Sequence, residues 1–318
     1  MLIIGRLLLL ILTSISLGEF SKRIIRHLDS YTRHAGISHF AATAIIISLT
    51  TSFPELIVAV SSSFKNASAL AFGNALGANM INISLVIGLT AIVGKSLFFN
   101  HSTRPDKILL PLLFSFLPLI FALNGTITRL EGLILLGFYF FYIRSLILSI
   151  RENPVISAPV QSSPKFISPH SVKHLLMIIF WGSLLVVAAQ IVISISHSMA
   201  GDLGLSLSFI GIFIISIGTT LPELFFNIKA VRHQHGSMAT ANVVGSCITN
   251  ANLILGLSAL INPITFTRSY DMILPIIEYF FVTVLFFFFV TTKKRLDTWE
   301  AYVLVVFFLF YALLEVLF

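Results

Sequence analysis

Long apolar runs constrain the fold of this chain more than any other feature. Ten of them are long enough to cross a bilayer as helices of roughly 20 residues. Only 10% of the 318 residues are charged and 57% are hydrophobic, whereas a soluble domain carries about 25% charged residues. The pattern predicts an all-α polytopic membrane protein with ten transmembrane helices. The runs lie near residues 2–20, 38–64, 69–93, 107–124, 128–149, 173–197, 205–231, 238–261, 271–292 and 297–317.

The first run, Met1 to Gly18, has the early arginine and leucine-rich core of a secretory signal. It lacks a clear small-x-small cleavage site, and the basic residues Lys22, Arg23 and Arg26 follow at once. We therefore expect it to be the first membrane helix.

From about residue 36 to residue 92, the first half of the chain aligns without a gap with the second half at a constant offset of 168 residues. Pro54-Glu55-Leu56 corresponds to Pro222-Glu223-Leu224, and Asn82 corresponds to Asn250. Low-complexity apolar sequence matches by chance at Leu and Ile, but not in register at Pro, Glu, Asn and Gly. The predicted organisation is a first five-helix repeat over 1–150 (motif region 48–92), a Pro/Ser-rich linker over 151–172 and a second repeat over 173–318 (motif region 216–260).

Five helices per repeat is an odd number, so the second copy is expected to enter the membrane from the opposite side as an inverted repeat. Lys and Arg concentrate in alternate connections, and the other face has only Arg6, Lys65, Arg129 and Arg268. Because basic loops stay in the cytoplasm, we expect a cytoplasmic linker and both termini outside. The expected location is the cell (inner or plasma) membrane.

A glutamate follows a proline inside an apolar run in both repeats. Residues 48–56 read SLTTSFPEL and residues 216–224 read SIGTTLPEL. A charge near the bilayer midplane costs at least ~2.5–3.5 kcal/mol on insertion scales, so it indicates a function. Helical spacing places two hydroxyls and the carboxylate on one face in each repeat, namely Thr51, Ser52 and Glu55, and Thr219, Thr220 and Glu223. The prolines disturb the turn before them, so carbonyls around 48–51 and 216–219 are expected to leave the helical ladder.

The next helix of each repeat carries asparagines at steps of four residues. Asn74 and Asn82 occupy one helix, and Asn242, Ser246 and Asn250 occupy the other. Gly77 and Gly245 allow close helix packing. The asparagines could bond across helices, but their occurrence in both repeats favours a polar site.

The side chains of this set supply oxygen, and thiolate and imidazole are missing apart from Cys247. Two carboxylates with hydroxyls and carboxamides suit a hard cation such as Ca²⁺, which takes 6–8 oxygens. The same oxygens could hold Na⁺, and competition for one pair of charges is a physical basis for exchange. We expect no catalytic site and no cofactor, and no basic run interleaved with aromatics predicts a nucleic-acid partner.

Other polar residues point elsewhere. Glu278 has no counterpart in the first repeat and is predicted to be structural or interfacial. Most histidines, His27 and His174 among them, lie in or beside the predicted cytoplasmic connections, where we expect them to be solvated.

With these residues in view, the chain resembles the sodium/calcium exchanger family of the calcium/cation antiporter superfamily. The resemblance rests on SFPEL and GTTLPEL in one pair of helices and on GNALGANMIN (73–82) and ANVVGSCITN (241–250) in the next. It implies ten helices in two inverted repeats, and long first helices that slide to switch access. It also implies an ion site centred on Glu55 and Glu223. The implied ligands around them are Thr51, Ser52, Asn82, Thr219, Thr220, Ser246 and Asn250, with the backbone carbonyls of Ser48 and Ser216.

Three positions depart from the family pattern. Thr50 replaces a glycine, Ala78 replaces a serine hydroxyl, and Asn250 stands where many relatives have aspartate. The expected function is Ca²⁺ extrusion in exchange for Na⁺ by alternating access. Because of the departures a Ca²⁺/H⁺ antiporter with the glutamates as proton carriers stays open. A channel and an intramembrane enzyme are the remaining alternatives, the latter disfavoured because the histidines lie at the helix ends.

Overall fold

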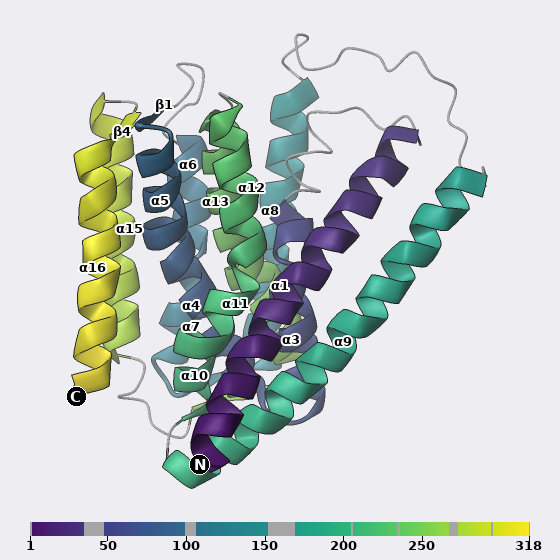
Figure 1. Ribbon diagram of the computed structural model, residues 1–318. Coiled ribbons are helices and arrows are strands. Elements are labelled where there is room, and N and C mark those ends of the chain that lie inside the picture. Colours follow the sequence, from purple (N-terminus) through teal and green to yellow (C-terminus); the bar gives the residue numbers. More distant parts are fainter. Residues whose placement is uncertain are drawn as a thin grey trace.

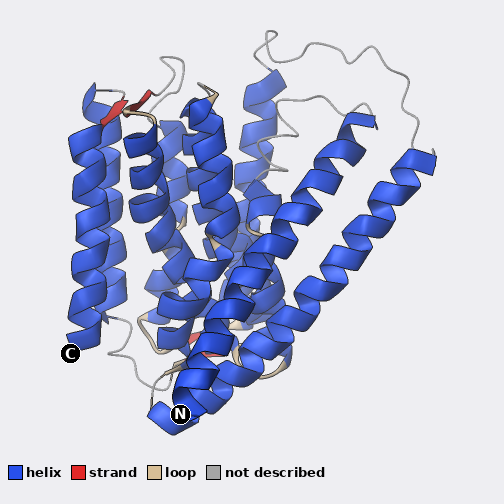
Figure 2. Ribbon diagram, viewed as in Figure 1, coloured by secondary structure: helices blue, strands red, loops and turns tan. Residues whose placement is uncertain are grey.

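The computed structural model is almost wholly helical, as the sequence predicts (Figure 2). It describes residues 2–34, 48–98, 106–151, 169–204, 206–233, 236–266, 273–293 and 295–317. The predicted linker, 151–172, falls mostly outside this part, so the division into 1–150 and 173–318 stays a prediction.

The elements of the first half are α1 (Leu2–His34), α3 (Phe53–Phe64), α4 (Ser68–Ile81), the π-helix η1 (Asn82–Val86), α5 (Ile87–Val93), β1 (Ser96–Phe98), α6 (Asp106–Phe114), α7 (Leu117–Ala122), β2 (Thr126–Ile127) and α8 (Arg129–Arg151). Those of the second half are α9 (Pro169–Leu203), α10 (Leu207–Ile210), the π-helix η3 (Gly211–Ile215), α11 (Ser216–Thr219), α12 (Leu221–Arg232), α13 (Gly236–Ile248), the π-helix η4 (Thr249–Ile254), α14 (Leu255–Ile261), β3 (Ile264–Thr265), α15 (Ile273–Lys293), β4 (Arg295–Asp297) and α16 (Thr298–Leu317).

Among the described residues, six helices are long and apolar enough to cross a membrane, or seven if the bent pair Leu207–Thr219 and Leu221–Arg232 counts as one span. Three shorter apolar helices accompany them at Phe53–Phe64, Leu109–Ala122 and Thr298–Leu313. The polytopic architecture is therefore confirmed, while the number ten stays a prediction. The difference arises because prolines interrupt the runs: α3 and α12 each have a proline as their second residue, and Pro111 lies within α6.

The helices differ in how much of their surface the protein covers. Most of Ser68–Val93 and Met238–Ile261 is buried inside the protein, whereas most of Arg129–Leu148 is exposed. The exposed side chains are large and apolar, for example Leu123 and Leu130, which suits contact with lipid. The helices of the two asparagine motifs thus form the centre of the molecule.

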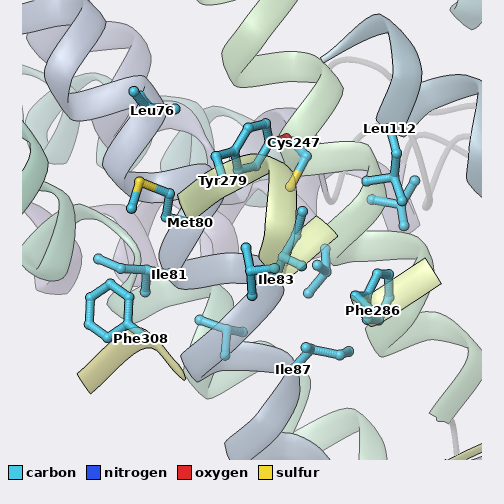
Figure 3. Close-up of a cluster of buried hydrophobic side chains, with 14 of the residues drawn as sticks. Leu76, Met80, Ile81, Ile83, Ile87, Leu112, Cys247, Tyr279, Phe286 and Phe308 are labelled. Carbon is cyan, nitrogen blue, oxygen red and sulfur yellow. The ribbon is translucent and has the colours of Figure 1, made fainter. Parts of the chain in front are cut away.

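One large apolar cluster packs α4, α13, α15 and α16 together. Figure 3 shows part of it, with Met80, Cys247, Tyr279, Phe286 and Phe308 grouped around the central helices. These side chains are at most 6% exposed. This packing holds the two central helices against each other and so fixes the place of the polar residues on them.

The two halves repeat in three dimensions as they do in sequence. Helices α3 and α12 have bounds that differ by 168 residues, and so do the starts of α4 and α13 and the whole of α5 and α14. Contacts between the halves are reciprocal: β1 pairs with β4, and its counterpart β3 pairs with β2. Equivalent elements of the two halves therefore make equivalent contacts, while the inverted relation between the halves stays a prediction.

Helices α1 and α9 are the longest elements, with 33 and 35 residues, and they cross the rest of the bundle obliquely (Figure 1). They occupy equivalent positions in the repeat but run in opposite directions (Figure 1). Leu10, Leu17 and Ala189 belong to the apolar cluster between them.

Polar contacts join α1 and α9 at both ends of the pair. Near the N-terminus Arg6 forms an ion pair with Asp202. At the other end of the pair, His27 Nδ1 lies 3.0 Å from His174 Nδ1. Both histidines are only half-buried, so the expectation that they are solvated stays a prediction, and the structure adds that they face each other.

The antiparallel packing of α1 and α9 predicts which introduced cysteines can be joined. Cysteines placed together at 27 and 174 are expected to be linked by a short bifunctional thiol reagent in native membranes, as read by altered mobility on a gel. Cysteines at 6 and 174 should stay separate, since 21 residues of helix separate positions 6 and 27 by about 30 Å. Native Cys247 is buried and should not compete. Linkage of the second pair without the first would contradict this arrangement.

Candidate cation-binding site

Two prolines break a pair of equivalent helices at the heart of the molecule. Pro222 is the second residue of α12, which follows α11 after Thr220, and the axis bends there by 40°. Because proline has no N–H, the carbonyl four residues earlier loses its partner; these carbonyls belong to Thr50 and Gly218. The Thr50 carbonyl instead accepts a hydrogen bond from Ser21 Oγ of α1 (3.4 Å).

The carbonyls that the sequence analysis favoured as ligands remain bonded within their helices. The carbonyl of Ser48 accepts from the Ser52 amide (3.1 Å), and that of Ser216 accepts from the Thr220 amide (3.0 Å). Each also accepts from a threonine hydroxyl, Thr51 at 3.3 Å and Thr220 at 2.8 Å. The helical bonds lost to proline are thus those of the carbonyls two residues further along, since proline removes the bond to residue i−4 and no earlier one.

The two glutamates sit in the first turn after each break. Glu55 and Glu223 are both 0% exposed, and neither carboxylate oxygen has a hydrogen-bond partner among the described residues. They lie within electrostatic reach of one another. Thr219 lies beside Glu55 and Thr51 beside Glu223, without the geometry of a hydrogen bond. Each carboxylate therefore faces a threonine of the other half.

A reciprocal pair of hydrogen bonds links the breaks to the central helices. Thr51 Oγ1 donates to Asn242 Oδ1 (3.3 Å), and its counterpart Thr219 donates to Asn74 Oδ1 (3.1 Å). The sequence predicts that Asn74 and Asn242 lie on the polar faces of their helices, but the expected ligand set does not include them. The signal that could have singled them out is their recurrence at the same offset as the glutamates.

Two glycines let the central helices approach the breaks of the opposite half. A Cβ atom on Gly77 would come within 2.7 Å of Ser216 Oγ, and one on Gly245 would collide with Ser48 Oγ. The Ser48 and Ser216 side chains are thereby enclosed between halves. Next to Gly245, Ser246 Oγ lies 3.4 Å from Thr51 Oγ1, a hydroxyl that the first half cannot match at Ala78.

The central helices change to π-helical turns at the second asparagine of each motif. Asn82 begins η1 and Asn250 lies in η4, and such turns inside α-helices are frequent at functional sites. Both amide atoms of Asn82 lack a partner among the described residues, as does Oδ1 of Asn250. Buried polar atoms of this kind are rarely left unpaired, so these amides are available to a ligand.

The predicted ligands are all buried, and contacts between the halves bring Thr51 close to Ser246 and to Glu223, and Thr219 close to Glu55. All are at most 6% exposed: Ser48, Thr51, Ser52, Glu55, Asn82, Ser216, Thr219, Thr220, Glu223, Ser246 and Asn250. Within the described part of the chain, no three His, Cys, Asp or Glu side chains form a group suited to a metal. Any cation held here would depend on hydroxyls and carboxamides beside the two carboxylates. Glu278, on α15, is 5% exposed, and its Oε1 has no hydrogen-bond partner among the described residues.

Comparison with known proteins identifies the family of the chain. The sequence profile described as sodium/calcium exchanger protein matches residues 5–148 and again residues 173–317. The chain is 26% identical to the sodium/calcium exchanger MaX1 of Methanosarcina acetivorans over 98% of each sequence. It is 29% identical to the inner membrane protein YrbG of Escherichia coli, over 76% of this chain and 77% of that one. It is 27% identical to the putative antiporter CaxA of Alkalimonas amylolytica over 76% of each.

A solved structure of the sodium-calcium exchanger NCX_Mj shares the fold. The TM-score is 0.63 over 97% of both chains, at 22% sequence identity. The profile matches cover most of the chain and fall once in each half. The chain belongs to the sodium/calcium exchanger family of integral membrane proteins.

Proposed function

We propose that this protein exchanges Ca²⁺ for Na⁺ across the membrane by alternating access and so extrudes Ca²⁺. The observation that carries the proposal is the pair of buried, unpartnered carboxylates of Glu55 and Glu223, which lie within electrostatic reach of each other. An uncompensated buried charge costs several kcal/mol. Two such groups side by side therefore need a cation, or a pair of them, for the protein to be stable.

The surrounding oxygens favour Ca²⁺ as one of these cations. Ca²⁺ accepts 6–8 oxygen ligands in flexible geometry, and the proposed ligand set combines two carboxylates with hydroxyls and carboxamides. Na⁺ can use the same atoms, with two or more ions neutralising the same charges. Repulsion between the two carboxylates destabilises the empty site, so the protein switches access from one side of the membrane to the other only when cations are bound. Coupling of the two fluxes follows from that penalty.

We also propose that ten spans cross the membrane as two inverted five-helix repeats. The three shorter apolar helices, added to the seven candidate spans, give this number. The opposite directions of α1 and α9 and the position of both termini at one end of the bundle support it (Figure 1). The distribution of basic residues places that end outside the cell.

The experiment that tests the exchange measures uptake of radiolabelled Ca²⁺ into proteoliposomes. We expect uptake when the vesicles contain Na⁺ and the bath does not, and no uptake when Na⁺ is replaced by choline on both sides. Uptake in the absence of any counter-ion gradient, through a conductance, would contradict antiport.

A Ca²⁺/H⁺ antiporter is the second candidate, favoured by Ala78, which gives the first half one hydroxyl fewer. Protons neutralise carboxylates without needing further oxygen ligands. Uptake driven by a pH gradient in sodium-free buffer, at a rate equal to that with Na⁺, would establish this alternative.

A further inference from the structure

Asn79 and Cys247 are equivalent positions at which the two halves of the site differ. These residues contact each other: Asn79 Nδ2 donates to the Cys247 carbonyl at 3.1 Å, and Cys247 Sγ lies 4.0 Å from the Asn79 carbonyl. They are 2% and 0% exposed. A residue that touches its own counterpart lies on the two-fold axis between the halves. An asymmetry here acts on both halves at once.

The Asn79 carboxamide has one orientation that satisfies its neighbours. A backbone carbonyl can only accept, so the group facing Cys247 must be Nδ2. Asn79 Oδ1 then points to the other side, where it accepts from Asn250 Nδ2 at 3.1 Å. This contact in turn leaves Oδ1 as the unpartnered atom of Asn250. The Cys247 carbonyl thus fixes the orientation of the Asn79 carboxamide, which in turn fixes that of Asn250, so that Oδ1 of Asn250 is the atom available to a cation.

Neighbouring side chains hold Asn79 in place. The Tyr279 ring lies beside Cys247 (Figure 3), and its hydroxyl is in contact with Asn79. That hydroxyl is itself fixed by Ser115 Oγ at 2.6 Å. Cys247 also lies within electrostatic reach of Glu223, so the supported amide belongs to the surroundings of the carboxylates.

Asn82, the counterpart of Asn250, has no such support. By the repeat, its supporting residue would be the counterpart of Asn79, which is Cys247. A thiol is a weak donor and a weak acceptor and cannot replace a carboxamide. Consistent with this, neither Nδ2 nor Oδ1 of Asn82 has a partner in the described structure. One asparagine is therefore oriented before a cation arrives, and the other is not.

We propose that Asn79 is a positioning residue that orients the Asn250 carboxamide toward the transported cation, and that Cys247 withholds this support from Asn82. The proposal rests on the function proposed above. It makes the two halves unequal in cation binding although their ligands are nearly the same. It also explains an amide at 250: an aspartate there would place a carboxylate against Asn79 Oδ1, two acceptors with no proton between them.

A double-mutant cycle tests the positioning role, using Ca²⁺ affinity of the purified full-length protein measured by calorimetry. Asn79→Ala is expected to weaken Ca²⁺ binding on the order of 10-fold, as is usual for residues that orient metal ligands, and Asn250→Ala by at least as much. The combination should be no weaker than Asn250→Ala alone, because Asn79 acts through Asn250. Multiplying effects, or an Asn250→Ala variant with unchanged affinity, would overturn the proposal.

A second arm of the test gives Asn82 the support that it lacks. Cys247→Asn is expected to tighten Ca²⁺ binding several-fold, whereas the control Cys247→Ser, which is too short to reach Asn82, should leave it unchanged. Weakened or unchanged affinity in Cys247→Asn with an unaltered melting temperature would contradict the inferred asymmetry. Should Asn79→Ala not fold, Asn79→Leu retains the volume and lacks the hydrogen bonds.

Two outcomes separate this inference from the proposed function. If Glu55→Gln and Glu223→Gln bind Ca²⁺ as the wild type does, the proposed site itself is wrong. If those variants lose binding while the cycle is additive, the site stands and the positioning role alone fails.

Discussion

Replacing either buried glutamate with glutamine, Glu55→Gln or Glu223→Gln, is expected to reduce Ca²⁺ uptake to the level of protein-free liposomes. Glutamine keeps the size of the side chain and removes its charge. One remaining carboxylate cannot neutralise a divalent cation in a region shielded from water, where the cost of an unbalanced charge is several kcal/mol. The measurement is uptake of radiolabelled Ca²⁺ driven by an imposed Na⁺ gradient.

The same substitutions should have an opposite effect on the empty protein. Without bound cations the two carboxylates of the wild type repel each other across the buried region, and one amide relieves that repulsion. The ion-free melting temperature of Glu55→Gln is therefore expected to equal or exceed that of the wild type. Ca²⁺ should stabilise the wild type in proportion to its binding, by about 2.7 kcal/mol at a concentration 100 times the dissociation constant, and stabilise the variants little.

Glu278 provides a matched control for the charge change. It is also a buried glutamate in a membrane helix, but it has no counterpart in the first repeat and lies outside the proposed site. Glu278→Gln should retain the Na⁺-driven uptake and the Ca²⁺-dependent stabilisation. Wild-type uptake by both Glu55→Gln and Glu223→Gln, or loss of uptake in Glu278→Gln alone, would contradict the assignment of the central carboxylates.

Much of the framework could be predicted because it depends on local chemistry that repeats. Apolar runs predicted the helices, and matched Pro, Glu and Asn residues predicted that α3 and α12, and α4 and α13, are equivalent. The run near 271–292 corresponds to α15 at Ile273–Lys293. Patterns of this kind are visible in sequence because every membrane helix must meet the same lipid solvent.

What could not be predicted depends on contacts between the halves. The pairing of His27 with His174, and that of Asn79 with Cys247, joins residues 147 and 168 positions apart, and neither has a local signature. The π-helical turns at Asn82 and Asn250 are likewise invisible in sequence, since each depends on a single inserted step in the hydrogen-bond ladder. The asymmetry of the site therefore emerges only when the two halves are packed together.

The close packing of helices at the centre of the protein leads to the second prediction of a large mutational effect. Helix α4 crosses α10 and η3 with backbone against backbone at Gly73. A Cβ atom there would lie 2.7 Å from both Cα and C of Ser208 and would collide with its carbonyl oxygen. On the other helix, a Cβ atom on Gly211 would lie 2.6 Å from the Asn74 amide nitrogen. Backbone atoms in two packed helices cannot move aside as a flexible side chain can, so the glycines are required for this crossing.

Gly73→Ala is therefore expected to destabilise the protein by about 3 kcal/mol, the upper part of the range for overpacked cores. It should also impair transport, because separating the helices moves Asn74 away from Thr219, with which it is hydrogen bonded at 3.1 Å. Thermal unfolding in detergent, followed by tryptophan fluorescence, measures the first effect, and Na⁺-driven Ca²⁺ uptake measures the second.

Gly182 on α9 supplies the comparison, since nothing lies within 4 Å of a Cβ atom built there. In the middle of a helix alanine is favoured over glycine by roughly 0.5–1 kcal/mol, so Gly182→Ala should melt at the same temperature or higher and transport normally. The same glycine-to-alanine change is thus expected to alter the stability of the protein in opposite directions at the two positions. Equal melting temperatures for Gly73→Ala and Gly182→Ala would mean that α4 and α10 do not cross at the distance described. In that case the placement of Asn74 beside the helix break would also be wrong.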